Sequence, residues 1–204
     1  MSKDQLTQLR SIAREILEAA LLAVDARQVT RKAIGVEGNR VRIGHTVLDE
    51  TKPIYVVSIG KASMAMAEAL NETLGDRIAK AIVTGQQPQR LNPNWQVFSG
   101  GHPLPNADSL NAATAAFQLL DKANDEHAVV IFAVSGGGSA MIEWPSTSAI
   151  TLDDLREANR ILVSCGDRSS PCLHSFSLQN RLSQINLRNE EQEGGYGVSR
   201  VGRQ

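Results

Sequence analysis

Apolar residues recur along this chain with two spacings, and the two alternate. Residues 5–26 repeat them at the three-to-four-residue spacing of an amphipathic helix. Four short apolar runs, at 54–59, 78–85, 95–100 and 128–134, are typical of the buried strands of a parallel sheet. Helical patterns at 60–76, 109–124 and 151–165 separate or follow these runs. The chain therefore reads as repeated strand–helix units.

Local signals support several of these elements. Residues 35–50 carry alternating apolar and arginine positions between turn glycines, which predicts a small hairpin. Gly75 is placed to end the helix over 60–76, as glycine commonly does. Thr151 is a good N-cap for the helix over 151–165, and Asp153 and Asp154 suit its first turn.

Alternating strands and helices predict an α/β fold: a three-layer, Rossmann-like, mostly parallel sheet with flanking helices. We expect this domain to span residues 1–166. Residues 167–204 are rich in Ser, Asn, Gln, Arg and Gly and have almost no apolar periodicity. Such a segment buries too little apolar surface to offset its ordering entropy, so we expect an irregular or disordered tail with one short helix around 178–185.

Composition narrows the function classes. The 204 residues carry a formal net charge of −1 and only 4% aromatic residues, so we expect no nucleic-acid partner. No apolar stretch approaches the length of a membrane span, and the N-terminus lacks the apolar core of a signal peptide. Cys165 and Cys172 show no metal-binding spacing, so we expect no metal site and a cytoplasmic location.

The stretch "VSGGGSA" follows the last predicted strand directly. Glycines at such a strand end let backbone N–H groups approach an anion, and a following helix N-terminus would add its dipole. The alternative is a tight turn that only needs left-handed backbone. The stretch fits neither the Walker A pattern nor the dinucleotide fingerprint. The candidate phosphate-binding residues here are Ser135, Gly136, Gly137, Gly138, Ser139 and Ala140.

A second candidate is "SIGKAS", where Gly60 and Lys61 follow the first parallel strand. A lysine in the first turn of a helix opposes the helix dipole, unless a bound phosphate makes the placement favourable. Lys61 is therefore the candidate catalytic residue, as a cation that positions phosphate, and a solvated lysine is the alternative.

The loop "SGGHPLPN" supplies His102 and Pro103, which on composition alone are more typical of structural than of catalytic positions. Glu143 is a lone carboxylate after the glycine stretch, and we interpret it as a cap or a surface charge.

Together, "SIGKAS", "GGHPLPN", "VSGGGSA" and "TLDDLREANRILVSCG" resemble the glycerate 2-kinase family over about residues 5–166. The resemblance implies a Rossmann-like N-terminal domain, a second α/β domain and a site in the cleft between them. It implies ATP-dependent phosphorylation of D-glycerate to 2-phosphoglycerate with Mg²⁺. It also implies a catalytic role for Lys61, a nucleotide-phosphate cradle at 135–140 and a cleft position for His102 and Pro103.

The resemblance stops abruptly after Gly166, and the family's second domain does not follow. We therefore expect a truncated or frameshifted reading frame whose product shows little or no turnover and self-associates through an exposed cleft face. Two alternatives stay open: a non-catalytic fragment that binds a nucleotide or phosphate, and an NAD(P)-dependent hydroxypyruvate reductase, a label that some family members carry.

Overall fold

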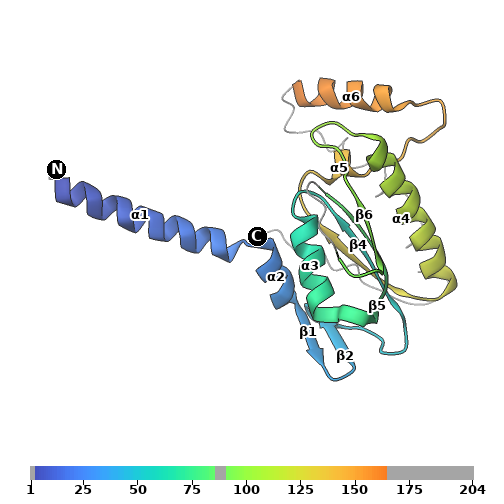
Figure 1. Cartoon of the computed structure of the whole chain (residues 1–204), viewed down its shortest axis with the longest axis horizontal. Helices are drawn as coiled ribbons and strands as arrows, with labels where there is room; N and C mark the ends of the chain where they lie inside the picture. The colour runs from blue at the N-terminus through green and yellow to red at the C-terminus, as the bar shows by residue number, and fades with distance from the viewer. Residues whose placement is uncertain (1–2, 86–90, 165–204) are drawn as a thin grey trace.

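The computed structural model describes residues 3–85 and 91–164. Its centre is a sheet of four parallel strands in the order β6-β5-β4-β7 (Figure 1). The strands are β4 (Ile54–Ile59), β5 (Ile78–Thr84), β6 (Trp95–Phe98) and β7 (Val129–Val134). Each lies within a run that the apolar pattern predicted, and β4, at the centre, is buried along its whole length.

Helices cover both faces of this sheet (Figure 1). On one face, α3 (Ser63–Leu74) packs Ala67 and Leu70 into a core with Val56 and Val83. On the other, α4 (Ala107–Asp125) packs its alanines against Val57 and Ile82. The α/β fold with a three-layer, parallel sheet is thereby confirmed.

The predicted helix ends are found where the sequence placed their signals. Gly75 ends α3 with a φ of 52° and begins the short 3-10 turn η1 (Gly75–Arg77). Before α6 (Leu152–Ser164), the Thr151 hydroxyl accepts the Asp154 N–H at 3.2 Å, and the Asp154 carboxylate accepts the Thr151 N–H at 2.8 Å. This reciprocal cap confirms Thr151 as the N-cap.

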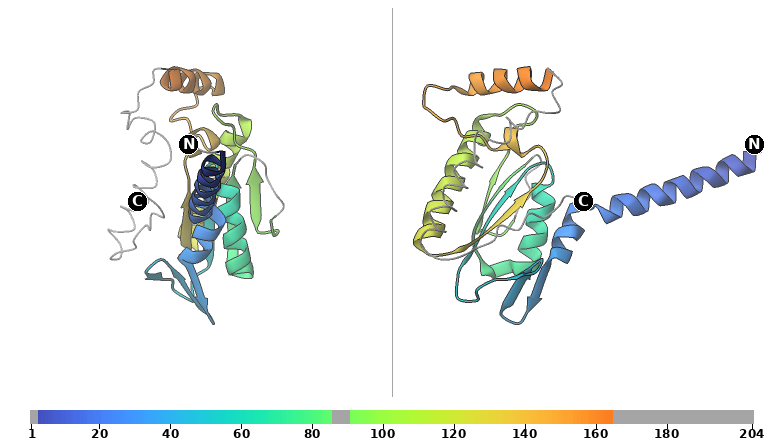
Figure 2. Two further views of the ribbon diagram at one scale, coloured as in Figure 1. Left: turned by 90° about the vertical axis from the view of Figure 1, so that its left-hand side faces the viewer. Right: turned by 180° about the vertical axis from the view of Figure 1, so that it is seen from behind.

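The N-terminal segment differs from the prediction of one helix over 5–26. The structure has two, α1 (Lys3–Ala23) and α2 (Ala26–Ala33). The break occurs because the Asp25 carboxylate accepts the Gln28 N–H at 2.8 Å and caps a new helix. The predicted hairpin is a three-stranded antiparallel sheet of β1 (Ile34–Glu37), β2 (Arg40–Ile43) and β3 (Thr46–Val47). Figure 2 shows α1 extending away from the sheet and its helices.

The expected tail at 167–204, the short helix around 178–185, Cys165 and Cys172 lie outside the described residues. Within residues 3–85 and 91–164, no helix combines the length and apolar character needed to cross a membrane.

Buried hydroxyl groups tie the carboxyl ends of the strands to the loops that follow them. Ser58 of β4 donates to the Ser63 carbonyl, and Ser63 donates to the Thr84 carbonyl, both at 2.8 Å. Thr84 of β5 donates in turn to the Met141 carbonyl at 2.7 Å. Met141 ends α5 (Gly138–Met141), and α4 reaches the same turn, because Ser109 donates to the Ala140 carbonyl at 2.7 Å. We call Ser58, Ser63, Thr84 and Ser109 the hydroxyl network.

Replacing Thr84 by Val keeps the side-chain shape but leaves the buried Met141 carbonyl without its hydroxyl donor. We expect Thr84→Val to lower the free energy of unfolding by about 1–3 kcal/mol, the cost of stranding a buried acceptor. The matched control is Thr114→Val, because Thr114 is exposed on α4 and bonds only within its own helix. Urea unfolding followed by circular dichroism measures both, and equal losses in the two variants would contradict the role of Thr84.

Candidate functional site

The two loops that the sequence singled out meet at one edge of the sheet. Ile59 at the end of β4 is paired with Val134 at the end of β7, so the chain leaves both strands side by side. The Lys61 N–H donates to the Gly136 carbonyl at 3.0 Å, and the Ala62 N–H donates to the Ser135 hydroxyl at 2.9 Å. The loops are therefore bonded directly to each other.

Gly60 makes this close approach possible. Its φ is 107°, a conformation that L side chains rarely adopt. A Cβ on Gly60 would also lie 2.4 Å from the Ser135 carbonyl oxygen. Only a residue without a side chain fits where the two loops cross.

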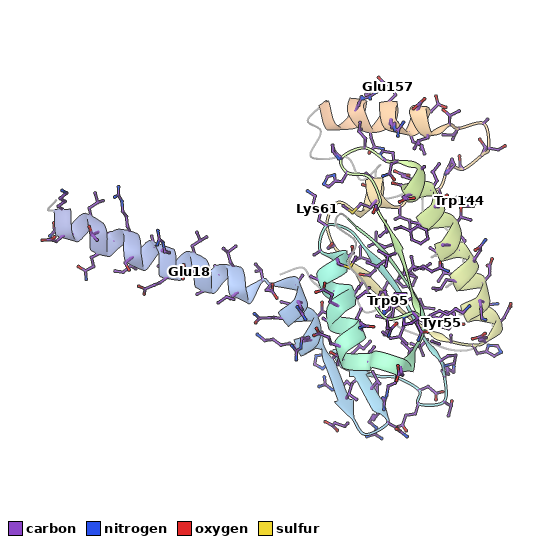
Figure 3. The ribbon with its side chains drawn as sticks, in the orientation of Figure 1. Glu18, Tyr55, Lys61, Trp95, Trp144 and Glu157 are labelled. Carbon is purple, nitrogen blue, oxygen red and sulfur yellow. The ribbon has the colours of Figure 1, made fainter. Side chains whose placement is uncertain are left out.

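Gly137 brings Lys61 and His102 together. It has a left-handed φ of 83°, and a Cβ built on it would lie 3.0 Å from Lys61 Cε and 3.3 Å from His102 Nε2. A cation, an imidazole and bare backbone from three separate loops thus converge on one point. In Figure 3, Lys61 lies at the edge of the sheet where α3 begins.

The electrostatic state of His102 follows from this position. Burial, and then the positive charge of Lys61, lower the pKa of the His102 imidazole below its ordinary value. The ring is neutral at pH 7 and can accept a proton. The neighbouring Pro103 is exposed, and the His102–Pro103 peptide bond is cis.

Three details of the sequence interpretation are wrong. Lys61 precedes α3, which begins at Ser63, so it is not in the first helical turn. The N–H groups of Lys61 and Ala62 are held by the glycine stretch, so they do not face a ligand as helix N-terminal donors. The helix that begins at the third glycine, α5, has only four residues, too few for a helix dipole of useful size. A phosphate bound at Ser135–Gly137 would therefore meet loop backbone.

The residues of the glycine stretch differ in exposure. Gly136 and Ser139 are exposed, and a Cβ on Gly136 would have no heavy atom within 4 Å. Gly138 is half-buried and packs against Ile59, while Ala140 is buried beneath α4. The open positions of the stretch are thus Gly136, which is bonded to Lys61, and Ser139.

Glu143 is not the surface charge that the sequence suggested. It is half-buried after α5, its N–H donates to the Ser109 carbonyl at 3.1 Å, and its side chain hydrogen-bonds Asn159 of α6. Burial raises the pKa of Glu143 to about 7, although the Asn159 bond favours the ionised form. The sequence did contain one signal of this burial, because Glu143 lies between the apolar residues Ile142 and Trp144.

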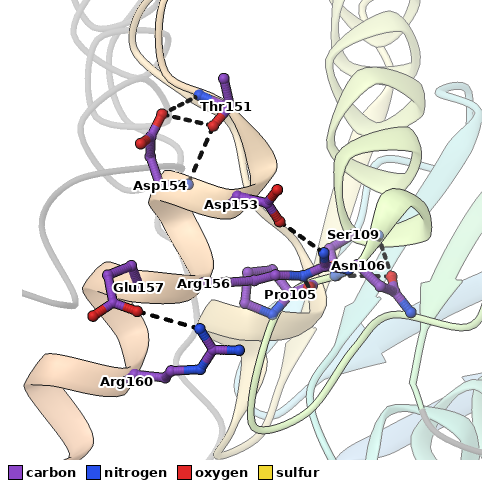
Figure 4. A network of polar contacts seen from close by, with 9 residues as sticks. All are labelled: Pro105, Asn106, Ser109, Thr151, Asp153, Asp154, Arg156, Glu157 and Arg160. Carbon is purple, nitrogen blue, oxygen red and sulfur yellow. Dashed lines mark hydrogen bonds and ion pairs between the residues drawn. The ribbon is translucent and has the colours of Figure 1, made fainter.

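Helix α6 is fixed to the loop that carries His102. The Arg156 guanidinium donates to the Pro105 carbonyl at 3.0 Å and pairs with Asp153 at 3.0 Å (Figure 4). The Asn159–Glu143 bond adds a second attachment. A helix over the carboxyl ends of the strands thereby holds the "HPLP" loop in place.

Alanine substitutions at Gly60 and Gly136 distinguish a glycine that the loop crossing requires from one that faces open space. Gly60→Ala forces a side chain onto a strained backbone and into the Ser135 carbonyl, so we expect it to cost at least about 1–3 kcal/mol of stability. Gly136→Ala enters open space and should leave the unfolding midpoint almost unchanged. Thermal unfolding of both variants tests this, and a tolerated Gly60→Ala would contradict the crossing.

The raised pKa of Glu143 makes stability depend on pH. The unfolded chain releases this proton near the ordinary value of 4.5, whereas the folded chain keeps it up to about 7. The contribution of Glu143 to the free energy of unfolding is therefore greatest below pH 4.5. It falls as the pH rises to about 7 and is constant above that pH.

Glu143→Gln removes this dependence. We expect it to raise the free energy of unfolding by up to about 3 kcal/mol near pH 8, with little gain near pH 4. Glu157→Gln is the control, because Glu157 is exposed on α6. Urea unfolding at the two pH values measures the gain, and an equal gain at both would show that burial of Glu143 is not its cause.

Comparison with known proteins gives consistent matches. Residues 12–169 match the family model described as "Domain of unknown function (DUF4147)". The chain is 28% identical over 161 residues to a glycerate 2-kinase of Pyrococcus horikoshii, covering 78% of this chain and 35% of that protein. It is 30% identical over 115 residues to a D-glycerate 2-kinase of Thermotoga maritima, covering 55% and 27%. The chain spans about a third of the length of these curated relatives.

Solved structures agree with the fold. A crystal structure of a protein from Pyrococcus horikoshii superposes with a TM-score of 0.66 at 26% identity, covering 78% of this chain and 36% of that one. A crystal structure of a Thermotoga maritima glycerate kinase superposes with a TM-score of 0.61 at 23% identity, covering 78% and 36%. The family match extends over most of the sequence, and the chain therefore belongs to the DUF4147 family, whose relatives here include glycerate kinases.

Proposed function

We propose that this chain provides the nucleotide-phosphate wall of a glycerate 2-kinase site. The convergence of Lys61, His102 and Gly137 carries the proposal. Phosphoryl transfer depends on positioning and on neutralising negative charge, and an exposed ammonium beside bare glycine backbone can do both. The names of the relatives supply the reaction class, the phosphorylation of D-glycerate to 2-phosphoglycerate.

In the proposed reaction, the terminal phosphate of ATP lies over the glycine stretch 136–138 with Lys61 as its counter-charge. The 2-hydroxyl oxygen of D-glycerate forms a bond to the terminal phosphorus, the bond from that phosphorus to ADP breaks, and the hydroxyl proton leaves. His102 is the candidate acceptor of that proton, because its imidazole is held neutral beside Lys61. Pro103 fixes the backbone next to it.

Mg²⁺ is the metal expected with ATP. Among the residues that the structure describes, no group of three or more His, Cys, Asp or Glu side chains could hold a metal ion. A Mg²⁺ ion that enters with ATP would take most of its ligands from phosphate oxygens and water, and it needs no more than one or two protein carboxylates.

Lys61, Gly136 and Ser139 are exposed, so the proposed site is an open surface on this chain. Orientation of the acceptor and exclusion of water supply much of the rate of such a transfer. We therefore expect these 204 residues to bind ATP weakly and to release ADP from ATP and D-glycerate slowly or not at all.

Titration calorimetry with ATP tests the phosphate site. Lys61→Met should weaken ATP binding by about tenfold or more, because the counter-charge is lost while the aliphatic stem is kept. Lys32→Met, on the exposed side of α2, is the control and should bind ATP like the unaltered chain. Equal ATP affinity in both variants would refute the role of Lys61.

A coupled assay for ADP with D-glycerate tests catalysis separately. Fast ADP release that Lys61→Ala abolishes would overturn the expectation of low turnover while supporting the site.

A further inference from the structure

Helix α6 lies over the carboxyl ends of the strands and is held there mainly by polar side chains (Figures 1 and 2). No described residue of α6 belongs to the apolar clusters that cover the two faces of the sheet. Among residues 152–161, whose burial is described, Asn159 alone is buried, at 7% exposure, whereas Ile161 is 53% exposed. The attachment of α6 to the body therefore depends on a few individual contacts.

One contact joins Asn159 to Glu143. The Asn159 side-chain nitrogen donates to the Leu155 carbonyl at 2.9 Å within its own helix, and the side chain also bonds the Glu143 carboxyl. Glu143 in turn is fixed to the body, because its N–H donates to the Ser109 carbonyl at 3.1 Å. Helix α6 thus rests on a half-buried carboxyl group through a buried amide.

The other contact holds the loop of His102. The Arg156 guanidinium donates to the Pro105 carbonyl at 3.0 Å, and Pro105 is fully buried. Because Arg156 and Asn159 are three residues apart, they lie on the same side of α6. A helix held by so few contacts moves as a unit, so a change at the Asn159 contact also changes the Pro105 contact. We call the helix with these two contacts the α6 clamp.

The Glu143 carboxyl is the part of the clamp that responds to pH. Burial raises its pKa to about 7, although the Asn159 bond favours the ionised form, and no charged group of the described residues is among the causes. An ionised Glu143 is therefore poorly solvated while α6 is in place, and it gains water when α6 moves away. The charged or titratable side chains on α6, on the first turn of α4 and in the loop of His102 are Asp153, Asp154, Arg156, Glu157, Arg160, Asp108 and His102.

We propose that protonation of Glu143 controls how firmly α6 clamps the loop of His102. With Glu143 neutral, the clamp is closed and the loop is held. Ionisation favours an opened state in which the carboxylate is hydrated, the Asn159 bond is broken and the Pro105 carbonyl is released. The meaning of this control for activity rests on the proposed function, because His102 is the candidate proton acceptor there.

Hydrogen exchange of the full chain, measured by mass spectrometry and corrected for intrinsic rates, tests the clamp. The closed state keeps the Glu143 proton up to about pH 7, and the opened state only up to the ordinary value of 4.5. We therefore expect the amides of α6 and of loop 99–106 to lose about tenfold of their protection between about pH 6 and about pH 8. Glu143→Gln should abolish this change, whereas Glu157→Gln, at an exposed position on α6, should keep it.

Strand β4 is the internal reference, because it is buried along its whole length and exchanges only when the whole chain unfolds. Exchange of α6 as slow as that of β4 would show that the helix opens only with global unfolding, and this would overturn the proposal. A pH effect of the same size in Glu143→Gln would overturn it as well.

Arg156→Met tests whether the clamp acts on the loop. It removes the bond to the Pro105 carbonyl, so we expect loop 99–106 to lose about tenfold of its protection already at about pH 6, while α6 still responds to pH. Arg160→Met, at an exposed position on the same helix, is the control. A loop with unchanged protection in Arg156→Met would refute the coupling. These experiments use no ATP, so their failure is distinct from failure of the phosphate site, which the ATP titration of Lys61→Met tests.

Discussion

The site depends on the hydroxyl network at the carboxyl ends of the strands. Ser58, Ser63, Thr84 and Ser109 are buried, and each donates to a backbone carbonyl of another element or loop. The Met141 carbonyl at the end of α5, for example, would lose its hydroxyl donor while buried, at a cost of about 1–3 kcal/mol. The network therefore sets the position of α5, and with it the glycine stretch that precedes this turn.

Helix α6 provides a second constraint on the site. Helix α6 is bonded to the Pro105 carbonyl through Arg156 and to Glu143 through Asn159. Its first turn is stabilised by the reciprocal Thr151–Asp154 cap. The cap fixes where the helix begins, and with it the positions of Arg156 and Asn159. The loop of His102 is thus held from the α6 side, and the loops of Lys61 and Gly137 from the sheet side. Ser109 links the two sets of bonds, because its hydroxyl also accepts the Gly101 N–H at 3.0 Å in the loop of His102. The three groups converge because both sets position them.

Sequence reasoning recovered what depends on local patterns. The four strands, α3, α4 and α6 follow from apolar spacing and from caps at Gly75 and Thr151, because those signals lie within the element itself. The break at Asp25 was missed because apolar spacing continues across it, and only the Gln28 hydrogen bond decides it. The burial of Glu143 depends on α4 and α6, which are distant in sequence. The same holds for the occupied N–H groups of Lys61 and Ala62, whose partners lie more than seventy residues away.

The strand order also has a kinetic consequence. Pairing of β4 with β5 joins Ile54 to Ile78, whereas pairing of β4 with β7 joins Ile54 to Val129, across a segment about three times as long. Closing the longer loop costs about 1 kcal/mol more entropy, so we expect β4, α3 and β5 to form a local unit before β7 joins them. Strand β7 then docks onto an edge already in place. Because Gly60 follows β4 and the glycine stretch follows β7, we expect the crossing of their loops to form in that late step, after most of the core has folded.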